Sequence, residues 1–154
     1  MADTAANLTP TVHASAVLVG PHAVLIRGAS GAGKSSLALD LLQAAATGAL
    51  RFARLVADDR CHLEARAGRL LVRPAPQLAG LIEVRGLGIR QLPYEPVAVV
   101  GLVIDLGAAS ERMPTKADEP TKMLGIAVRR LAVAGGSEAL RAILAVFRIP
   151  AAGI

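Results

Sequence analysis

The sequence predicts an α/β protein of one domain. Three observations carry this prediction. The 154 residues, of which 53% are hydrophobic, are enough for a single core. Short apolar segments typical of strands alternate with turn residues along most of the chain. A glycine-rich run then lies between one such strand and a segment with helical spacing of its leucines and alanines.

The first elements are a pair of strands followed by a helix. Residues 15–19 and 23–27 are apolar and β-prone, and Gly-Pro-His at 20–22 joins them, which predicts a hairpin or two successive strands. After the glycine-rich run, residues 35–46 are rich in Leu and Ala at helical spacing, and Thr-Gly at 47–48 ends the helix.

The middle of the chain predicts mainly strands. Residues 55–57 are a short buried strand, and residues 61–66 and 69–73 are two more. Residues 81–89 contain two glycines, which favours a loop or a distorted strand over a helix. Residues 97–104 form the longest apolar run and predict a central strand.

The last third predicts a loop, a strand and a helix. Residues 111–122 carry two prolines and six charges, which indicates an exposed loop, and residues 126–133 are a further strand candidate. Ser137 is expected to cap a final helix that runs to about Phe147, with Glu138 in its first turn. We expect residues 1–11 to be a flexible tail and residues 12–150 to form the domain.

Composition excludes several classes of protein. No apolar run approaches the roughly 20 residues needed to cross a bilayer, and the first residues do not resemble a secretory signal. The single cysteine, Cys61, cannot form an internal disulfide, which agrees with a cytoplasmic protein. The net charge of +5 suits an anionic partner, but the arginines are scattered and aromatics are scarce, so nucleic acid is not expected.

The strongest motif is a phosphate-binding loop. Residues 28–35 match G-x-x-x-x-G-K-[ST] in the required context of strand, loop and helix. Small residues let backbone N–H groups surround phosphate oxygens at a helix N-terminus. Lys34 is expected to reach the β- and γ-phosphates of a nucleoside triphosphate, and Ser35 to bind Mg²⁺. The predicted nucleotide-binding residues are Gly28, Ala29, Ser30, Gly31, Ala32, Gly33, Lys34, Ser35 and Ser36.

A site of this kind also needs a carboxylate at the end of a strand, to hold the metal or accept a proton. Asp58 and Asp59 together form one candidate and Asp105 the other, and the residues alone do not decide between them. Because neighbouring side chains on an extended chain point in different directions, we expect one of Asp58 and Asp59 to face the phosphates while the other has a structural role.

Four segments together resemble the bacterial HPr kinase/phosphorylase family, in its C-terminal catalytic domain. They are His13, the loop 28–35, Leu-Val-Ala-Asp-Asp-Arg at 55–60 and Ile-Glu-Val-Arg-Gly-Leu-Gly-Ile at 82–89. The last is the most specific, and the resemblance covers about residues 11–106. It implies a P-loop kinase with a mixed sheet, similar to the phosphoenolpyruvate carboxykinase-like fold.

The resemblance also implies roles for single residues. Asp59 would accept the proton of a seryl hydroxyl, with Asp58 beside it. Ser35 and Glu83 would be the Mg²⁺ ligands, and Arg85 would lie around the transferred phosphoryl group. Two further active-site positions are implied at His13 and Arg112.

The function implied is an ATP- and Mg²⁺-dependent protein serine kinase acting on the phosphocarrier HPr or an HPr-like protein, in the regulation of carbon metabolism and phosphotransferase signalling. A homo-oligomer, as in the hexamers of the family, is also implied. The chain resembles a short form without the family's N-terminal domain, and the basic, glycine-containing pattern associated with phosphorolysis is not found, so the reverse reaction is not predicted. Two alternatives stay open: a P-loop kinase for a small metabolite, and a nucleotide-sensing protein without turnover.

Overall fold

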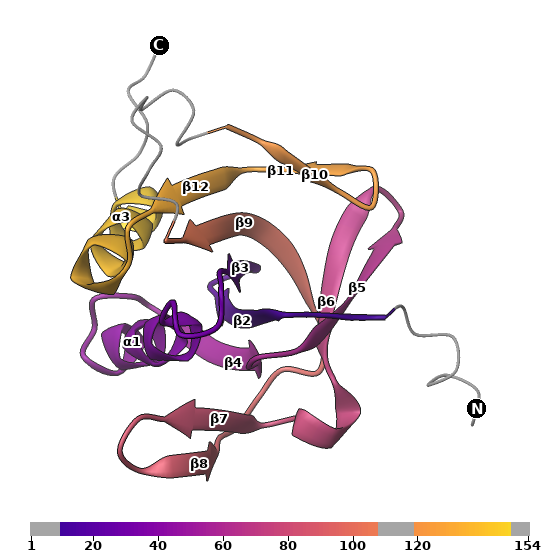
Figure 1. Ribbon diagram of the computed structural model, residues 1–154. Helices are drawn as coiled ribbons and strands as arrows, with labels where there is room; N and C mark the ends of the chain where they lie inside the picture. The colour runs from indigo at the N-terminus through magenta and orange to yellow at the C-terminus, as the bar shows by residue number, and fades with distance from the viewer. Residues whose placement is uncertain (1–9, 108–118, 149–154) are drawn as a thin grey trace.

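A computed structural model describes residues 10–107 and 119–148 (Figure 1). Its helices are α1 (Lys34–Ala46), the short 3-10 helix η2 (Pro76–Leu78) and α3 (Gly136–Arg148). Its strands are β1 (Thr11–Val12), β2 (Ala14–Val19), β3 (His22–Arg27), β4 (Ala53–Ala57), β5 (Cys61–Arg66), β6 (Arg69–Pro74), β7 (Leu81–Val84), β8 (Gly88–Gln91), β9 (Ala98–Leu106), β10 (Thr121–Met123), β11 (Ile126–Val128) and β12 (Arg130–Val133).

Most of the strands form one mixed sheet. The strand order is β1-β5-β6-β9-β3-β2-β4, and β12 also pairs with β9. The pairs β3–β9 and β9–β12 are parallel, whereas the other neighbours are antiparallel. The ribbons β7–β8 and β10–β11 are separate two-stranded sheets at opposite sides of the molecule (Figure 1). The α/β class and the mixed sheet are therefore confirmed.

The two long helices lie together on one face of this sheet (Figure 1). Leu37 and Leu41 of α1, together with Ile143 of α3, are buried in one apolar cluster with side chains of β2, β3 and β9. A second cluster covers the opposite face and includes Leu63 and Leu70 of the β5–β6 hairpin. Strands β3 and β9 contribute to both clusters because their successive side chains alternate between the two faces.

The early elements agree with the sequence prediction. Strands β2 and β3 form the predicted hairpin, in which Val19 pairs with His22. The helix after the glycine-rich run begins one residue earlier than predicted, at Lys34. The longest apolar run is indeed a central strand, because β9 is flanked by β3, β6 and β12.

Other boundaries differ from the prediction. Residues 81–89 do not form a single distorted strand, because a turn joins β7 to β8 and Val84 pairs with Gly88 across it. Residues 126–133 are two strands that separate at Arg129 and pair with different partners. Thr11 pairs with His62 and so belongs to the sheet rather than to a tail. Residues 1–9, most of the predicted tail, and most of the predicted loop 111–122 lie outside the described residues.

The start of the last helix also differs from the prediction. Helix α3 begins at Gly136, so Ser137 lies inside its first turn, where its side chain is exposed. The N–H of Ala139 donates to the carbonyl of Gly135. Gly135 and Gly136 both have positive φ, and this glycine turn sets the helix start in place of a serine cap. Glu138 does lie in the first turn, as predicted.

Candidate functional site

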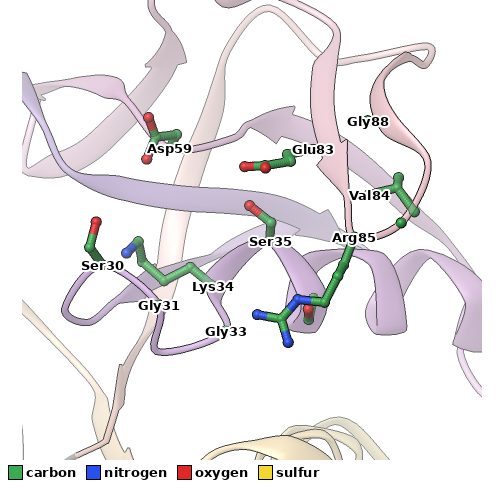
Figure 2. Close-up of a pocket in the computed structure, with 12 residues that line it drawn as sticks. Ser30, Gly31, Gly33, Lys34, Ser35, Asp59, Glu83, Val84, Arg85 and Gly88 are labelled. Carbon is green, nitrogen blue, oxygen red and sulfur yellow. The ribbon is translucent and has the colours of Figure 1, made fainter.

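A cavity of about 490 Å³ opens at the N-terminus of α1, between the glycine-rich loop and the β7–β8 hairpin (Figure 2). Its walls bring together segments that are far apart in the sequence. The residues that line it are Ser30, Gly31, Gly33, Lys34, Ser35, Ser36, Asp59, Glu83, Val84, Arg85, Gly86 and Gly88. Most of the residues predicted from the two best motifs, at 28–36 and 82–89, therefore meet in one place.

The loop itself has the backbone that its glycines predict. Gly31 and Gly33 have φ of 84° and 100°, in the left-handed region that favours glycine. Gly33 is the N-cap of α1 and its carbonyl accepts the N–H of Leu37 at 2.9 Å. The Nζ of Lys34 donates to the carbonyls of Gly28 (2.9 Å) and Ala29 (3.2 Å). These two hydrogen bonds fix the ammonium group of Lys34 against the first residues of the loop.

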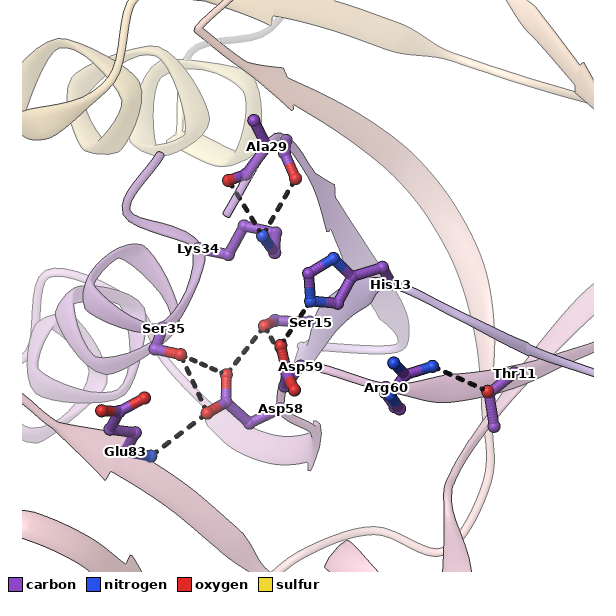
Figure 3. Close-up of polar contacts among 11 residues, drawn as sticks. Thr11, His13, Ser15, Ala29, Lys34, Ser35, Asp58, Asp59, Arg60 and Glu83 are labelled. Atoms are coloured by element: carbon purple, nitrogen blue, oxygen red, sulfur yellow. Dashed lines mark hydrogen bonds and ion pairs between the residues drawn. The ribbon is translucent and has the colours of Figure 1, made fainter. Parts of the chain in front are cut away.

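Asp58 is the buried carboxylate of the site, 5% exposed. It accepts hydrogen bonds from the hydroxyl of Ser15 at 2.8 Å and from the hydroxyl of Ser35 at 2.7 and 2.9 Å (Figure 3). The backbone N–H of Glu83 donates to the same carboxylate at 3.1 Å. One side chain therefore connects β2, the start of α1 and β7, which gives Asp58 a structural role in addition to its position beside Ser35.

Asp59 points away from this network. Its φ is 72°, a left-handed conformation that Asp tolerates better than most residues. Its side chain is 57% exposed, and its Oδ1 lies 2.6 Å from Nε2 of His13 (Figure 3). The backbone N–H of Asp59 donates to the buried hydroxyl of Ser15 at 3.2 Å. The expectation that Asp58 and Asp59 face different surroundings is confirmed.

Asp105 does not line the cavity, and both its oxygens are engaged elsewhere. Arg27 binds it with two hydrogen bonds, at 2.7 and 2.8 Å, and Arg130 binds one of the same oxygens. Burial alone would raise the pKa of Asp105, but hydrogen bonds and charges of the two guanidinium groups outweigh burial, and the pKa is lowered. Of the two candidates that the sequence left open, Asp58 and Asp59 lie beside the phosphate loop and Asp105 does not.

The β7–β8 hairpin forms the opposite wall of the cavity. Figure 2 shows the carboxylate of Glu83 directed toward Ser35 and Asp59, and the guanidinium of Arg85 extended toward Gly33. Oxygens of Ser35, Asp58 and Glu83 are the hard ligands that a magnesium ion prefers. No group of three or more His, Cys, Asp and Glu side chains with metal-binding geometry occurs among the described residues. Arg112 lies outside them.

Ser15 is the site residue that sequence reasoning missed. It is completely buried and contacts both aspartates, as acceptor from one and donor to the other. The only local signal is a hydroxyl in the otherwise apolar strand β2, and serine is common enough in strands for that signal to be weak.

The fold and the site together define an α/β protein with a glycine-rich loop that caps a helix after β3, and a pair of acidic residues at the carboxyl end of β4, two strands away in the same sheet. A family model described as HPr Serine kinase C-terminal domain matches residues 5–94. The chain belongs to this family, and the resemblance predicted from the motifs is confirmed.

Curated relatives and a solved structure agree with this assignment. The HPr kinase/phosphorylase of Clostridium acetobutylicum is 36% identical over 140 residues, which cover 81% of this chain and 43% of that protein. That of Bordetella avium is 36% identical over 143 residues, covering 83% and 44%. The chain therefore spans less than half the length of these two relatives. The Hpr(Ser) kinase/phosphatase structure from Coxiella burnetii superposes with a TM-score of 0.75, covering 91% of this chain and 95% of that one, at 24% identity, and thus supports the fold.

Among the described residues, neither long helix combines the length and the hydrophobicity that a membrane span requires.

Proposed function

We propose that the chain is an ATP- and Mg²⁺-dependent protein serine kinase that phosphorylates HPr or an HPr-like phosphocarrier. Family membership supports this proposal, as do a loop with the backbone of a phosphate site and an aspartate exposed at the rim of the same cavity. We further propose that it acts in the cytoplasm, as a homo-oligomer, in the regulation of carbon metabolism and phosphotransferase signalling.

The residues of the cavity fit a magnesium nucleotide. The N–H groups of the loop and the start of α1 would surround the phosphates, and Lys34 would exchange its two carbonyl partners for phosphate oxygens. Ser35 and Glu83, with Asp58 behind them, would hold Mg²⁺, which supplies positive charge to the β- and γ-phosphate oxygens when bound. Arg85 would stabilise charge on the transferred group from the opposite wall.

Asp59 would act as the base toward the acceptor serine. A bond forms between the seryl oxygen and the γ-phosphorus, the bond from the γ-phosphorus to the bridging oxygen breaks, and ADP leaves. The seryl proton passes to Asp59. His13 touches the carboxylate at 2.6 Å and would keep it oriented for this step.

The exposure of Asp59 is the observation that favours a protein acceptor. Its side chain is 57% exposed and that of its partner His13 is 42% exposed, so the base lies where a side chain on another protein can reach it. A kinase for a small metabolite needs a pocket that encloses its substrate around the base. A nucleotide-sensing protein would have no need of an exposed base beside the phosphate loop.

The test is transfer of label from γ-labelled ATP to the HPr of the same organism, with Mg²⁺ present. We expect label on a serine of HPr, a loss of about 10²–10⁴-fold in Asp59→Asn, and no transfer in Lys34→Met. Asparagine also tolerates the left-handed backbone at residue 59, so this variant removes the base without straining the turn.

Asp40→Asn is the matched control, because it makes the same chemical change on α1 outside the cavity. It should transfer like the wild type. Binding of MgATP without label on HPr would refute the proposed acceptor and favour a metabolite kinase or a nucleotide sensor. Equal losses in Asp59→Asn and Asp40→Asn would refute the role of Asp59.

A further inference from the structure

Three charged residues from three neighbouring parallel strands meet outside the cavity, at the carboxyl ends of β3 and β9 and the amino end of β12. Arg27 is the last residue of β3, Asp105 is near the end of β9, and Arg130 begins β12. One carboxylate binds both guanidinium groups: Nε and Nη2 of Arg27 donate to Oδ1 and Oδ2 at 2.7 and 2.8 Å, and Nε of Arg130 donates to Oδ2. We call these residues the Arg-Asp-Arg cluster.

The register of the sheet lets the Arg-Asp-Arg cluster link β3, β9 and β12 through side chains. Arg27 and Asp105 are direct partners across the parallel pair β3–β9, so their side chains project from the same face. On the other side of β9, Asp105 pairs with Ala132, and Arg130 is two residues before it on that same face. The side chains are 33%, 18% and 17% exposed, so water screens their attraction less than it screens a surface ion pair.

The Arg-Asp-Arg cluster lies directly beside the start of the glycine-rich loop. Gly28 follows Arg27 directly and lies against β9, because a Cβ added at Gly28 would meet the Cβ and the carbonyl oxygen of Leu106, each at 3.2 Å. The carbonyl of Gly28 in turn accepts the 2.9 Å hydrogen bond of Lys34 Nζ. A shift of the end of β3 relative to β9 would therefore move both the first residue of the loop and a partner of its lysine.

We propose that Arg27, Asp105 and Arg130 are positioning residues that hold the start of the loop in register with β9, so that phosphates meet a preformed cradle. This inference rests on the nucleotide binding proposed above. None of the three residues lines the cavity, so they act through Gly28 and Lys34 rather than by touching nucleotide. Backbone pairing of β3, β9 and β12 is extensive without them, so the cluster refines the position of the loop and is not needed for the sheet to form.

The critical variant is Asp105→Asn. The amide keeps the size of the carboxylate but removes the charge between two arginines and turns one acceptor into a donor that faces a guanidinium group. The two positive charges then repel each other at the end of β3. Displacement of a binding group by about 1 Å can cost as much as 10²-fold. We expect MgADP to bind at least about tenfold more weakly. Arg27→Lys keeps the charge but loses the two-pronged bond, and should give an intermediate loss.

The chain offers a close control in β5. Glu64 also lies between two arginines, with Arg73 at 2.5 Å and Arg66 at 3.4 Å, but it is on the hairpin far along the sheet from the loop. Glu64→Gln therefore removes the same kind of ion pairs without touching the start of the loop. It should bind MgADP within about twofold of the wild type.

The experiment is a fluorescence titration of the four proteins with a labelled ADP and Mg²⁺, at a temperature where circular dichroism shows each of them folded. For those that transfer phosphate, the KM for ATP should rise in Asp105→Asn while the KM for HPr stays unchanged. If folded Asp105→Asn binds MgADP as tightly as the wild type, the inference is wrong. If Asp105→Asn does not fold, wild-type affinity for MgADP in folded Arg27→Lys would overturn it instead. So would an equal loss in Glu64→Gln. A wild-type chain that binds MgADP but labels no HPr would refute the kinase proposal alone, because the binding comparison still tests the cluster.

Discussion

Replacement of Ser15 by alanine tests the polar network beneath the two aspartates. The change removes two hydrogen bonds from a completely buried position: the one that Ser15 donates to Asp58 at 2.8 Å and the one that it accepts from the N–H of Asp59 at 3.2 Å. Asp58 keeps its hydrogen bonds from Ser35 and from the backbone of Glu83, so the variant reduces the number of bonds to this buried carboxylate but does not remove them all.

The expected loss follows from these two bonds. A hydrogen bond to a charged acceptor contributes about 1.5–3 kcal/mol, and a buried N–H left without a partner costs about 1–3 kcal/mol. Because Asp59 is at the surface, we take the low end, about 1 kcal/mol, for its N–H and expect Ser15→Ala to lower the free energy of unfolding by about 2.5–4 kcal/mol. For a chain of this size that corresponds to a fall in Tm of about 5–16 °C.

Urea unfolding followed by circular dichroism measures this loss directly. The control is Ser137→Ala, which removes an exposed hydroxyl from the first turn of α3 and should change stability by no more than about 0.5 kcal/mol. An unfolding free energy for Ser15→Ala within about 0.5 kcal/mol of wild type would refute the assigned role of the network. A loss of about 1 kcal/mol or more in Ser137→Ala would show that Ser137 does cap the helix after all.

Three further outcomes follow from single positions. Because the pKa of Asp105 is lowered in the folded state, its carboxylate adds stability above about pH 4, and this contribution is lost as pH falls through the folded pKa. The difference in unfolding free energy between wild type and Asp105→Asn, measured with urea, should therefore shrink below about pH 4. A difference that grew there would contradict the ion pairing. Burial raises the pKa of Cys61 to about 12, so a thiol reagent at pH 8 should modify the chain only in denaturant, and rapid labelling of the native protein would contradict its burial. In Gly101→Ala the new Cβ would lie 2.7 Å from Cβ of His22, which should cost about 1–3 kcal/mol by thermal unfolding, and His22→Gly in the same chain should recover part of that loss.

The parts of the site that the sequence predicts well are those encoded locally. The β2–β3 hairpin and the turn from β3 through the loop into α1 depend on residues adjacent in sequence, and Gly31 and Gly33 have the backbone that only glycine adopts easily. The wrong cap at Ser137 is also a local matter: a serine before an apolar run satisfies the usual pattern, but the glycine pair just before it already turns the chain into the helix.

The parts that could not be predicted depend on which strands become neighbours. Asp105 follows directly on the longest apolar run of the sequence and lies one residue before the end of β9, so by pattern it is as good a candidate as Asp58. Only the pairing of β9 with β3 places it opposite Arg27, where two arginines neutralise it. In the same way, Ser15 precedes Asp58 by 43 residues, and the pairing of β2 with β4 brings them together.

The different surroundings of Asp58 and Asp59 show how one turn can serve two purposes. An extended chain would alternate the two side chains across the sheet, but β4 ends here, and the left-handed backbone of Asp59 turns its carboxylate out toward His13. Asp58 stays buried and is fixed by side chains from β2 and α1. A buried, hydrogen-bonded residue thus precedes an exposed one, and the exposed carboxylate is positioned without being enclosed. For the proposed transfer to a serine of another protein, this arrangement would present the carboxylate of Asp59 to the acceptor while its backbone N–H stays bonded to Ser15.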